Sequence, residues 1–157
     1  MQEISDLQRS EIHLWFADLN SLDRSAMSNE VAHWLHGEEK NRYNRYQSQS
    51  QREHFLFGRV LLKTILSKYI GCAPVDLKFD IDTRGKPFLS SNNTLSLTFN
   101  LSHSDNRLVF AVSKSQDLGV DLEIIKKERA IFKIAERYFS PAETRELRNL
   151  PKASQVK

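Results

Sequence analysis

Two acidic side chains in the second half of the chain have a spacing that suits a metal site. Asp121 and Glu123 stand two positions apart in Gly119–Glu123, which reads Gly-Val-Asp-Leu-Glu. We predict a strand over Leu118–Ile125, on which both carboxylates project from one face with Cβ atoms about 7 Å apart. Paired carboxylates repel each other unless a cation lies between them, and magnesium takes one or two of them with phosphate and water. A solvated strand face with two acids explains the same pattern.

A hydroxyl and an imidazole stand side by side at the end of another predicted strand. Ser102 and His103 lie in Phe99–Ser104, which reads Phe-Asn-Leu-Ser-His-Ser and enters a turn. Both side chains can donate hydrogen bonds to a phosphate, and a loop of free backbone N–H groups assists them. The alternative is a turn in which serine and asparagine satisfy local backbone groups.

A lysine lies in a predicted tight turn. Thr83–Pro87 contains Gly85, which permits the bend, and a proline that stiffens the exit, so the turn presents Lys86. A lysine on a rigid turn binds an anion with little loss of entropy. A solvated hairpin tip explains the same residues equally well. The spacing of a Walker loop is absent.

Basic residues are frequent between positions 40 and 63. Arg52, Arg59 and Lys63 stand at spacings of seven and four, so a helix places them on one face. Such a face is usually solvated, with the side-chain stems covering apolar surface. RNA contact is the rival interpretation because tyrosines alternate with arginines, although neighbouring acids weaken it. The basic residues are Lys40, Arg42, Arg45, Arg52, Arg59 and Lys63, with Tyr43 and Tyr46 among them.

An acidic side chain near the C-terminus has a structural explanation of its own. Ser140, Pro141 and Glu143 occupy the N-cap, N1 and N3 positions of a predicted helix. Together they form a capping box, so helix initiation alone explains this pattern. A catalytic role for Glu143 competes with that explanation.

The elements that must position these residues alternate between strands and helices. The longest helix is predicted over Gln51–Tyr69, ended by Gly71, and a shorter helical stretch near Val31–Leu35 is closed by Gly37. One long helix, then a strand meander, then helices indicates the α+β class. The predicted strands are Glu11–Leu19, Leu77–Ile81, Leu95–Leu101, Leu108–Ser113 and Leu118–Ile125, and the last helices are Ile131–Phe139 and Pro141–Leu150.

Composition excludes several classes of protein. The 157 residues suit one domain of ordinary size, and nine Phe exclude a wholly disordered chain. The net charge of +3 is too mild to demand a nucleic acid partner. A single cysteine, Cys72, excludes an internal disulfide and a multi-cysteine zinc site. Since neither a secretory signal nor a long apolar run is evident, we expect a cytoplasmic protein with no membrane partner.

The order of the motifs carries more information than any one of them. Gly-Lys-Pro, Phe-Asn-Leu-Ser-His-Ser, Gly-Val-Asp-Leu-Glu and Arg-Tyr-Phe-Ser-x-x-Glu follow one another at Gly85–Pro87, Phe99–Ser104, Gly119–Glu123 and Arg137–Glu143. This series resembles that of the Sfp-type 4′-phosphopantetheinyl transferases, in the holo-acyl-carrier-protein synthase superfamily. The resemblance extends from about Arg42 to Glu146.

The resemblance implies both a fold and an activity. The fold is the α+β fold of these transferases, with an N-terminal pseudo-half at 1–113 and, at 114–157, a linker and the opening of a second half. The activity moves the 4′-phosphopantetheine arm of coenzyme A onto a serine of an acyl or peptidyl carrier protein, releasing adenosine 3′,5′-bisphosphate with magnesium as cofactor. Fatty acid, polyketide and nonribosomal peptide synthesis are the pathways that such carriers serve.

The resemblance also implies roles for single residues. Asp121 and Glu123 match the magnesium-binding acids, and Glu143 matches an acidic position of the family whose task is open. The expected contacts to coenzyme A are Lys86, Ser102 and His103 at the nucleotide and phosphates, and Arg59 near the 3′-phosphate with assistance from Arg52 or Arg45.

One departure from the family pattern concerns the C-terminus. The family continues into a Trp-x-x-Lys-Glu segment, which supplies a further metal-side carboxylate and a phosphate-binding lysine, and no such segment precedes the last residue, Lys157. We therefore expect a chain truncated at the C-terminus and incomplete for catalysis. The alternatives are an inactive fragment that binds coenzyme A and, less favoured, an RNA-binding module.

Overall fold

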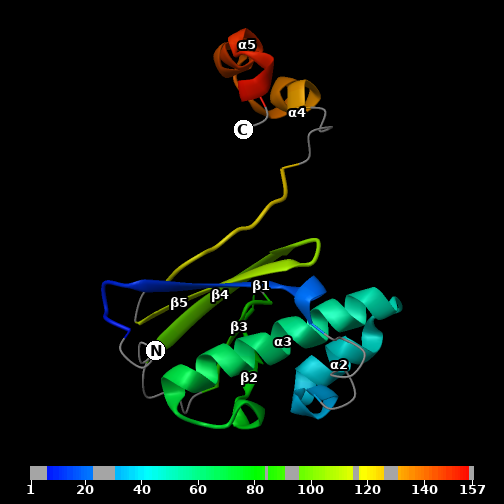
Figure 1. Cartoon of the computed structure of the whole chain (residues 1–157), viewed down its shortest axis with the longest axis vertical. Helices are drawn as coiled ribbons and strands as arrows, with labels where there is room; N and C mark the ends of the chain where they lie inside the picture. Colours follow the sequence, from blue (N-terminus) through cyan, green and yellow to red (C-terminus); the bar gives the residue numbers. More distant parts are fainter. Residues whose placement is uncertain are drawn as a thin grey trace. The chain divides into compact units, whose positions relative to one another are not determined.

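The computed structural model describes residues 7–22, 31–83, 85–90, 96–114, 117–125 and 131–155 (Figure 1). Its contacts divide the chain into two compact units, Met1–Leu122 and Glu123–Lys157. The sequence predicted a division after residue 113. That division stays a prediction. Within the first unit, the amides of Val120 and Leu122 are hydrogen-bonded to the side chains of Asn100 and Ser102.

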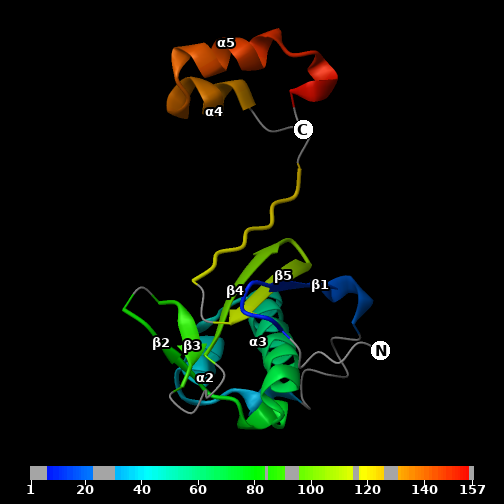
Figure 2. The same ribbon diagram turned by 90° about the vertical axis from the view of Figure 1, so that its left-hand side faces the viewer.

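The first unit is built around a three-stranded antiparallel sheet. Its strands are β1 (Ile12–Asp18), β4 (Leu97–Ser104) and β5 (Arg107–Lys114), in the order β1-β5-β4. The register pairs Trp15 with Phe110 and Phe99 with Val112. A separate hairpin pairs β2 (Phe79–Ile81) with β3 (Pro87–Leu89), and β3 lies against β4 (Figure 2).

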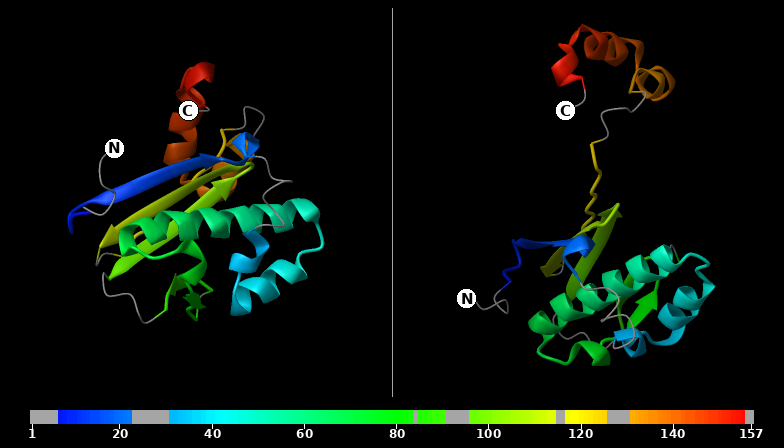
Figure 3. Two further views of the ribbon diagram at one scale, coloured as in Figure 1. Left: turned by 60° about the horizontal axis from the view of Figure 1, so that its bottom comes forward. Right: turned by 45° about the vertical axis from the view of Figure 1, so that its right-hand side comes forward.

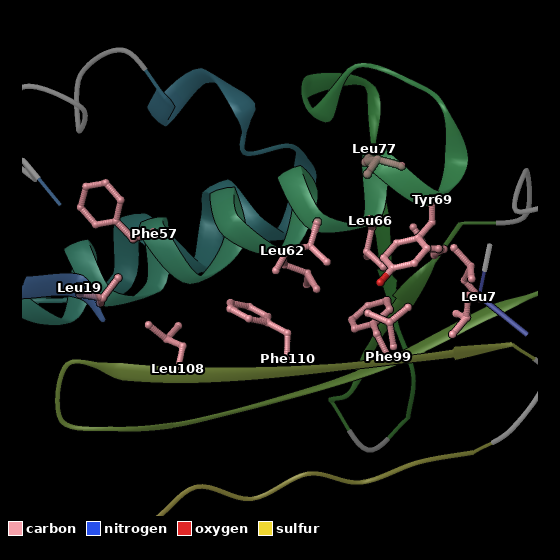
Figure 4. Close-up of a cluster of buried hydrophobic side chains, with 14 residues drawn as sticks. Leu7, Leu19, Phe57, Leu62, Leu66, Tyr69, Leu77, Phe99, Leu108 and Phe110 are labelled. Atoms are coloured by element: carbon pink, nitrogen blue, oxygen red, sulfur yellow. The ribbon is translucent and has the colours of Figure 1, made fainter. Parts of the chain in front are cut away.

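A long helix covers one face of this sheet. Helix α3 (Gln49–Ile70) confirms the helix predicted over Gln51–Tyr69, and it ends at Gly71, whose φ of 77° is the left-handed conformation that glycine tolerates best. Phe99, Leu108 and Phe110 point from the strands towards α3 (Figure 4). The buried cluster also contains Leu7, Leu19, Phe57, Leu62, Ile65, Leu66, Tyr69, Leu77, Leu89, Leu97 and Val112.

Strand β1 turns different faces to the core and to water. Trp15 and Ala17 pack against the buried cluster, and the Trp15 indole donates to the Tyr69 hydroxyl. Ile12, Leu14 and Phe16 alternate with them and are 53%, 53% and 71% exposed. Strand β1 therefore packs one row of side chains against the core and exposes a second row that is also apolar.

Helix α2 (Gly37–Arg45) corrects the sequence prediction around Gly37. That glycine begins a helix instead of closing one, and the stretch Val31–Leu35 holds a 3₁₀ turn at Ala32–Trp34. The reason is Glu39, which accepts a hydrogen bond from the backbone of His36 and is buried against basic side chains of α3. Glu39 of this charged stretch therefore pairs with residues distant in the sequence, and the periodicity of the stretch alone does not predict such contacts.

A second correction concerns Leu118–Ile125, which is not a strand. Residues 117–125 have no regular secondary structure. This segment does not pair with β4 as a strand would. Instead, two side chains of β4 accept hydrogen bonds from the amides of Val120 and Leu122. Strand β4 is longer than predicted, so Ser102 and His103 lie within the strand and not in a turn. Leu95 and Arg84 lie outside the described residues.

The second unit contains two helices in contact with each other (Figure 3). Helix α4 (Ile131–Tyr138) and helix α5 (Pro141–Asn149) confirm the two helices predicted there. Thr144 is buried and its hydroxyl donates to the carbonyl of Ala135, which ties the two helices together. The predicted capping box of α5 is present, since the Ser140 hydroxyl accepts from the amide of Glu143.

Candidate functional site

A pocket of about 590 Å³ opens in the first unit between helices and strands. Helices α2 and α3 form one wall, and β3, β4 and the turn after β4 form the other. Its volume is in the range of small-molecule sites. The lining residues are Arg42, Tyr46, Ser50, Gln51, His54, Phe55, Gly58, Arg59, Lys86, Pro87, Phe99, Asn100, Leu101, His103, Asp105 and Leu108.

Helix α3 contributes one continuous stripe to this pocket. The stripe recurs every three or four residues, because a helix places such positions on one face. At its N-terminal end His54 is fixed by two contacts, with Nδ1 2.7 Å from the carbonyl oxygen of Ser50 and Nε2 2.8 Å from Oδ1 of Asn106. These contacts join the start of α3 to the turn between β4 and β5. The residues of the stripe are Ser50, Gln51, His54, Phe55, Gly58 and Arg59.

Arg59 lines the pocket and belongs to a buried charge cluster with Glu39 and Lys63. Glu39 Oε1 lies 3.6 Å from Arg59 Nε, and Glu39 Oε2 lies 3.0 Å from Lys63 Nζ. All three residues are buried: Glu39 is 5% exposed, Arg59 is 6% exposed and Lys63 is 0% exposed. Lys63 also donates to the carbonyls of Trp34 and Leu77, at 2.5 and 2.8 Å. One carboxylate therefore faces two cations, and the cluster keeps a net positive charge.

Burial shapes the electrostatics of this cluster. Desolvation lowers the pKa of Arg59 and of Lys63, and the Glu39 carboxylate opposes that change in both. Among the described residues, Arg59 Nη1 has no hydrogen-bond partner although it is buried. Buried donors are normally satisfied, so this nitrogen at a pocket wall is suited to an anionic ligand.

Aromatic rings surround the arginines of the pocket. The guanidinium carbons of Arg42 and Arg59 lie 5.4 and 5.3 Å from the centroid of Phe55. Tyr46 packs against Phe55 with ring centroids 5.6 Å apart, and its hydroxyl accepts from Arg42 Nε at 3.1 Å. This arrangement offers flat apolar surface next to positive charge, as a nucleotide requires.

The opposite wall presents two of the predicted ligand contacts. Lys86 follows Gly85, whose φ is 81°, and the turn is closed by the Lys86 amide on Asp82 Oδ1 at 2.7 Å. His103 lies on β4, and Asp105 follows in the turn to β5. The structure thus brings Arg59, Lys86 and His103 to one pocket, from helix, turn and strand.

Other predicted contacts lie outside this pocket lining. Arg52 is exposed and its Nε donates to the carbonyl of Tyr46 at 2.8 Å, where α2 ends. Arg45 pairs with Glu38 across 3.4 Å, and both are well exposed. Arg59 and Lys63 are buried, so they do not contribute to the solvated basic face that the RNA interpretation requires.

The predicted metal-binding acids are found in the irregular segment after β5. Asp121 is exposed, and its Oδ1 accepts from the Ser102 hydroxyl at 2.8 Å and from the Leu122 amide at 2.9 Å. Glu123 is exposed and begins the second unit. Glu143 lies on α5 of that unit, where its Oε2 accepts from the amide of Ser140 at 2.8 Å. The hydrogen bonds with Ser140 lower the pKa of Glu143.

The donor set at Asp121 and Glu123 suits magnesium only in part. No group of three or more His, Cys, Asp or Glu close enough to hold a metal ion is found in the part of the chain that the structure describes. Two carboxylates are nevertheless an ordinary protein contribution to magnesium, which retains waters and takes phosphate oxygens. Two carboxylates would suit magnesium together with a phosphorylated ligand, and the assignment of Asp121 and Glu123 to the ion stays a prediction.

Sequence reasoning missed several pocket residues. The sequence places Arg42 and Tyr46 only in a basic stretch, and it assigns no role to His54 or Asp105. The α3 stripe could have been found by following Arg59 back along the helix in steps of three and four. The contribution of α2 could not, because it depends on the buried position of Glu39.

Comparisons with known proteins agree with this fold and this order of motifs. The family model described as "4′-phosphopantetheinyl transferase, N-terminal" matches residues 24–115. The chain is 37% identical over 146 residues to the 4′-phosphopantetheinyl transferase HetI of Nostoc sp. (strain PCC 7120 / SAG 25.82 / UTEX 2576), covering 92% of this chain and 61% of HetI. It is 29% identical over 110 residues to the 4′-phosphopantetheinyl transferase Sfp of Bacillus subtilis (strain 168), covering 70% and 47%.

A solved structure shares the fold. The holo-(acyl-carrier-protein) synthase of Bacillus anthracis str. Ames, determined in complex with CoA (3′,5′-ADP), superposes with a TM-score of 0.52 at 24% identity. The match covers 64% of this chain and 91% of that one. The α+β fold of these transferases, which the motif order predicted, is thereby confirmed.

The chain belongs to the 4′-phosphopantetheinyl transferase family. It spans 61% of the length of HetI and 47% of the length of Sfp. Within the described residues, no helix combines the length and the apolar character needed to cross a membrane.

Proposed function

We propose that this chain binds coenzyme A and takes part in transferring its 4′-phosphopantetheine arm to a serine of a carrier protein. The observation that carries the proposal is the convergence of Arg59, Lys86 and His103 on one pocket. These three residues come from separate motifs, and each was expected to contact coenzyme A.

The pocket has the chemistry of an adenosine 3′,5′-bisphosphate site. Phosphoryl transfer depends on positioning and on neutralising charge, more than on covalent participation by the protein. Arg42, Arg59 and Lys86 supply positive charge on two walls, and Phe55 and Tyr46 supply flat surface for a base. Among the lining residues Asp105 alone is acidic.

Residues 117–125, which we call the acidic segment, would hold the divalent ion of the reaction. Asp121 and Glu123 are the residues that we assign to magnesium, which when bound would neutralise the pyrophosphate of coenzyme A. Asn100 lines the pocket and also accepts a hydrogen bond from the Val120 amide, so one residue connects the two regions. A contact of Ser102 with the ligand, assistance by Arg52 or Arg45, and a catalytic role for Glu143 stay predictions.

The acceptor is expected to be an acyl or peptidyl carrier protein. Its serine hydroxyl would attack the β-phosphorus in line, form the phosphodiester, and release adenosine 3′,5′-bisphosphate, while the serine proton passes to a carboxylate or water. The pathway that supplies the carrier and the cytoplasmic location are also predictions from the sequence.

Mass spectrometry of a carrier protein tests the proposal. The purified chain is incubated with magnesium, coenzyme A and an apo carrier protein. A phosphopantetheine mass increment on the carrier would establish transfer and would contradict the prediction that this chain is incomplete for catalysis. Asp121→Ala should abolish the increment, whereas Asp117→Ala, an exposed acid of the same segment, should not.

Calorimetry with coenzyme A decides what a missing increment means. Binding without an increment would favour the inactive coenzyme A-binding fragment. Absence of both would contradict the proposal.

A further inference from the structure

The segment after β5 is attached to β4 by side chains that take the place of a strand partner. Asn100 Oδ1 accepts from the amide of Val120 at 3.0 Å, and Ser102 Oγ accepts from the amide of Leu122 at 3.1 Å. Both pairs step by two residues, so the spacing on the strand matches the spacing on the segment. We propose that Asn100 and Ser102 are positioning residues that hold this segment on β4 and aim the carboxylate of Asp121.

The extended backbone of the segment explains why two residues suffice. Alternate amides of an extended chain point to the same side, so Val120 and Leu122 direct their N–H groups towards β4. The residue between them, Asp121, then has its side chain within reach of the same serine. Among the described residues, the Val120 amide donates to Asn100, and the Leu122 amide donates both to Ser102 and to the carboxylate of Asp121. An unpaired amide would otherwise have to be satisfied by water.

Ser102 also fixes the acid itself. Its hydroxyl donates to Asp121 Oδ1 at 2.8 Å while it accepts from Leu122. A serine hydroxyl has a single proton, so in this arrangement Ser102 cannot donate to a phosphate at the same time. Asp121 Oδ1 is further held by the Leu122 amide. Among the described residues, Oδ2 receives no hydrogen bond, which leaves that oxygen for a ligand.

The inference rests on the proposed function only where it concerns the metal. Holding the segment is a property of the protein without any ligand. Aiming Asp121 matters because substitution of residues that orient a metal-binding carboxylate typically weakens metal binding by about 10- to 100-fold. The two parts are therefore tested by separate measurements.

Amide hydrogen exchange of the full chain, followed by NMR, tests the first part. Loss of one hydrogen bond should raise the exchange rate by roughly 3- to 10-fold, at Val120 in Asn100→Ala and at Leu122 in Ser102→Ala. Ser102→Thr keeps a hydroxyl and should restore slow exchange at Leu122. Thr98→Val is the matched control, because Thr98 lies on the same strand but bonds to Ser113 of β5. Equal rates in all variants would overturn the inference.

Binding of Mn²⁺ in the presence of adenosine 3′,5′-bisphosphate, measured by electron paramagnetic resonance, tests the second part. Ser102→Ala should lower the affinity for Mn²⁺ by about 10-fold relative to the unmodified chain, and Ser102→Thr should recover most of that affinity. Unchanged affinity in Ser102→Ala would overturn the aiming of Asp121. If the unmodified chain bound no Mn²⁺ while the exchange rates changed as expected, the metal assignment would fail and the anchoring of the segment would stand.

Discussion

The two regions that carry the site are held in different ways. The charge cluster at the pocket is fixed by burial, since Glu39, Arg59 and Lys63 are almost fully excluded from water. The acidic segment is exposed, and Asp121 is fixed by hydrogen bonds from Ser102 and Leu122. The position of the buried charge cluster is therefore stabilised by the whole core, whereas the position of Asp121 is stabilised by a few hydrogen bonds at the surface.

This difference has a consequence for ligand binding. A buried cation cannot move far, so the pocket presents its charge before any ligand arrives. The carboxylate of Asp121 is exposed and is held by a small number of hydrogen bonds, so its position depends on fewer contacts. We therefore expect substitutions in the buried charge cluster to unfold the protein, and substitutions at the acidic segment to change binding with little loss of stability.

The largest effect is expected for Glu39→Ala. Removing this carboxylate leaves Arg59 and Lys63 buried without their anion, and breaking a buried pair costs about 3–5 kcal/mol of unfolding free energy. Urea denaturation of the full chain measures the loss.

Glu38→Ala is the matched control for that substitution. Glu38 is the neighbouring residue of α2, and its pair with Arg45 is exposed. Exposed pairs contribute about 0–1 kcal/mol, so the control should remain near the unmodified chain. Similar losses in the two variants would contradict fixation of the cations by burial.

A smaller effect is expected for Lys86→Ala. Lys86 is held by its turn and not by burial among the core residues, so the protein should keep its stability. Loss of one charged hydrogen bond costs about 1.5–3 kcal/mol, which corresponds to roughly 10- to 100-fold weaker binding of adenosine 3′,5′-bisphosphate. Isothermal titration calorimetry measures the affinity. Lys78→Ala, which removes an exposed cation outside the pocket lining, should bind the ligand as the unmodified chain does.

The cap of α5 provides a third case, in which an exposed carboxylate is held by hydrogen bonds within one helix. Ser140→Ala removes the hydroxyl that accepts from the Glu143 amide. Loss of such a cap costs about 0.5–2 kcal/mol of helix stability. Hydrogen exchange of the α5 amides in the full chain should become faster, and Ser140→Thr should preserve the slower rates. No change in Ser140→Ala would show that contact with α4 alone maintains the helix.

The smallest effect is a pH dependence at the same cap. Hydrogen bonds with Ser140 lower the pKa of Glu143 in the folded state. A lowered carboxyl pKa stabilises the fold above the unfolded value, near 4.3, and this contribution is lost as the pH falls through the folded value. NMR titration of the Glu143 carboxyl measures the shift, and in Ser140→Ala its pKa should return part of the way upward. Because the backbone amide of residue 140 remains, an unchanged titration in that variant would exclude the serine hydroxyl as a cause.

The sequence predicted the elements whose periodicity or caps are local. Helix α3 and its end at Gly71, helix α5 with its capping box, and the paired strands β4 and β5 are all marked by spacing within a few residues. The start of α2 and the irregular course of 117–125 were predicted wrongly. Both depend on partners distant in sequence, Lys63 for Glu39 and the side chains of β4 for the acidic segment.

The site shows the same division. The resemblance to the family predicted ligand contacts at Lys86, His103 and Arg59, which the pocket brings together. The burial of Arg59 against Glu39 could not be predicted, because a basic residue on a helix is usually solvated. The use of the Ser102 proton by Asp121 also follows only from the tertiary structure.

Binding of adenosine 3′,5′-bisphosphate to the isotopically labelled full chain, followed by NMR, tests the central claim most directly. The account predicts saturable shifts of signals from Arg42, His54, Lys86 and His103, which line one pocket from four separate elements or turns. Signals from the exposed face of β1, at Phe16 for example, should not move. Saturable shifts confined to β1, or no saturable shift at millimolar ligand, would contradict the assignment of this pocket to coenzyme A.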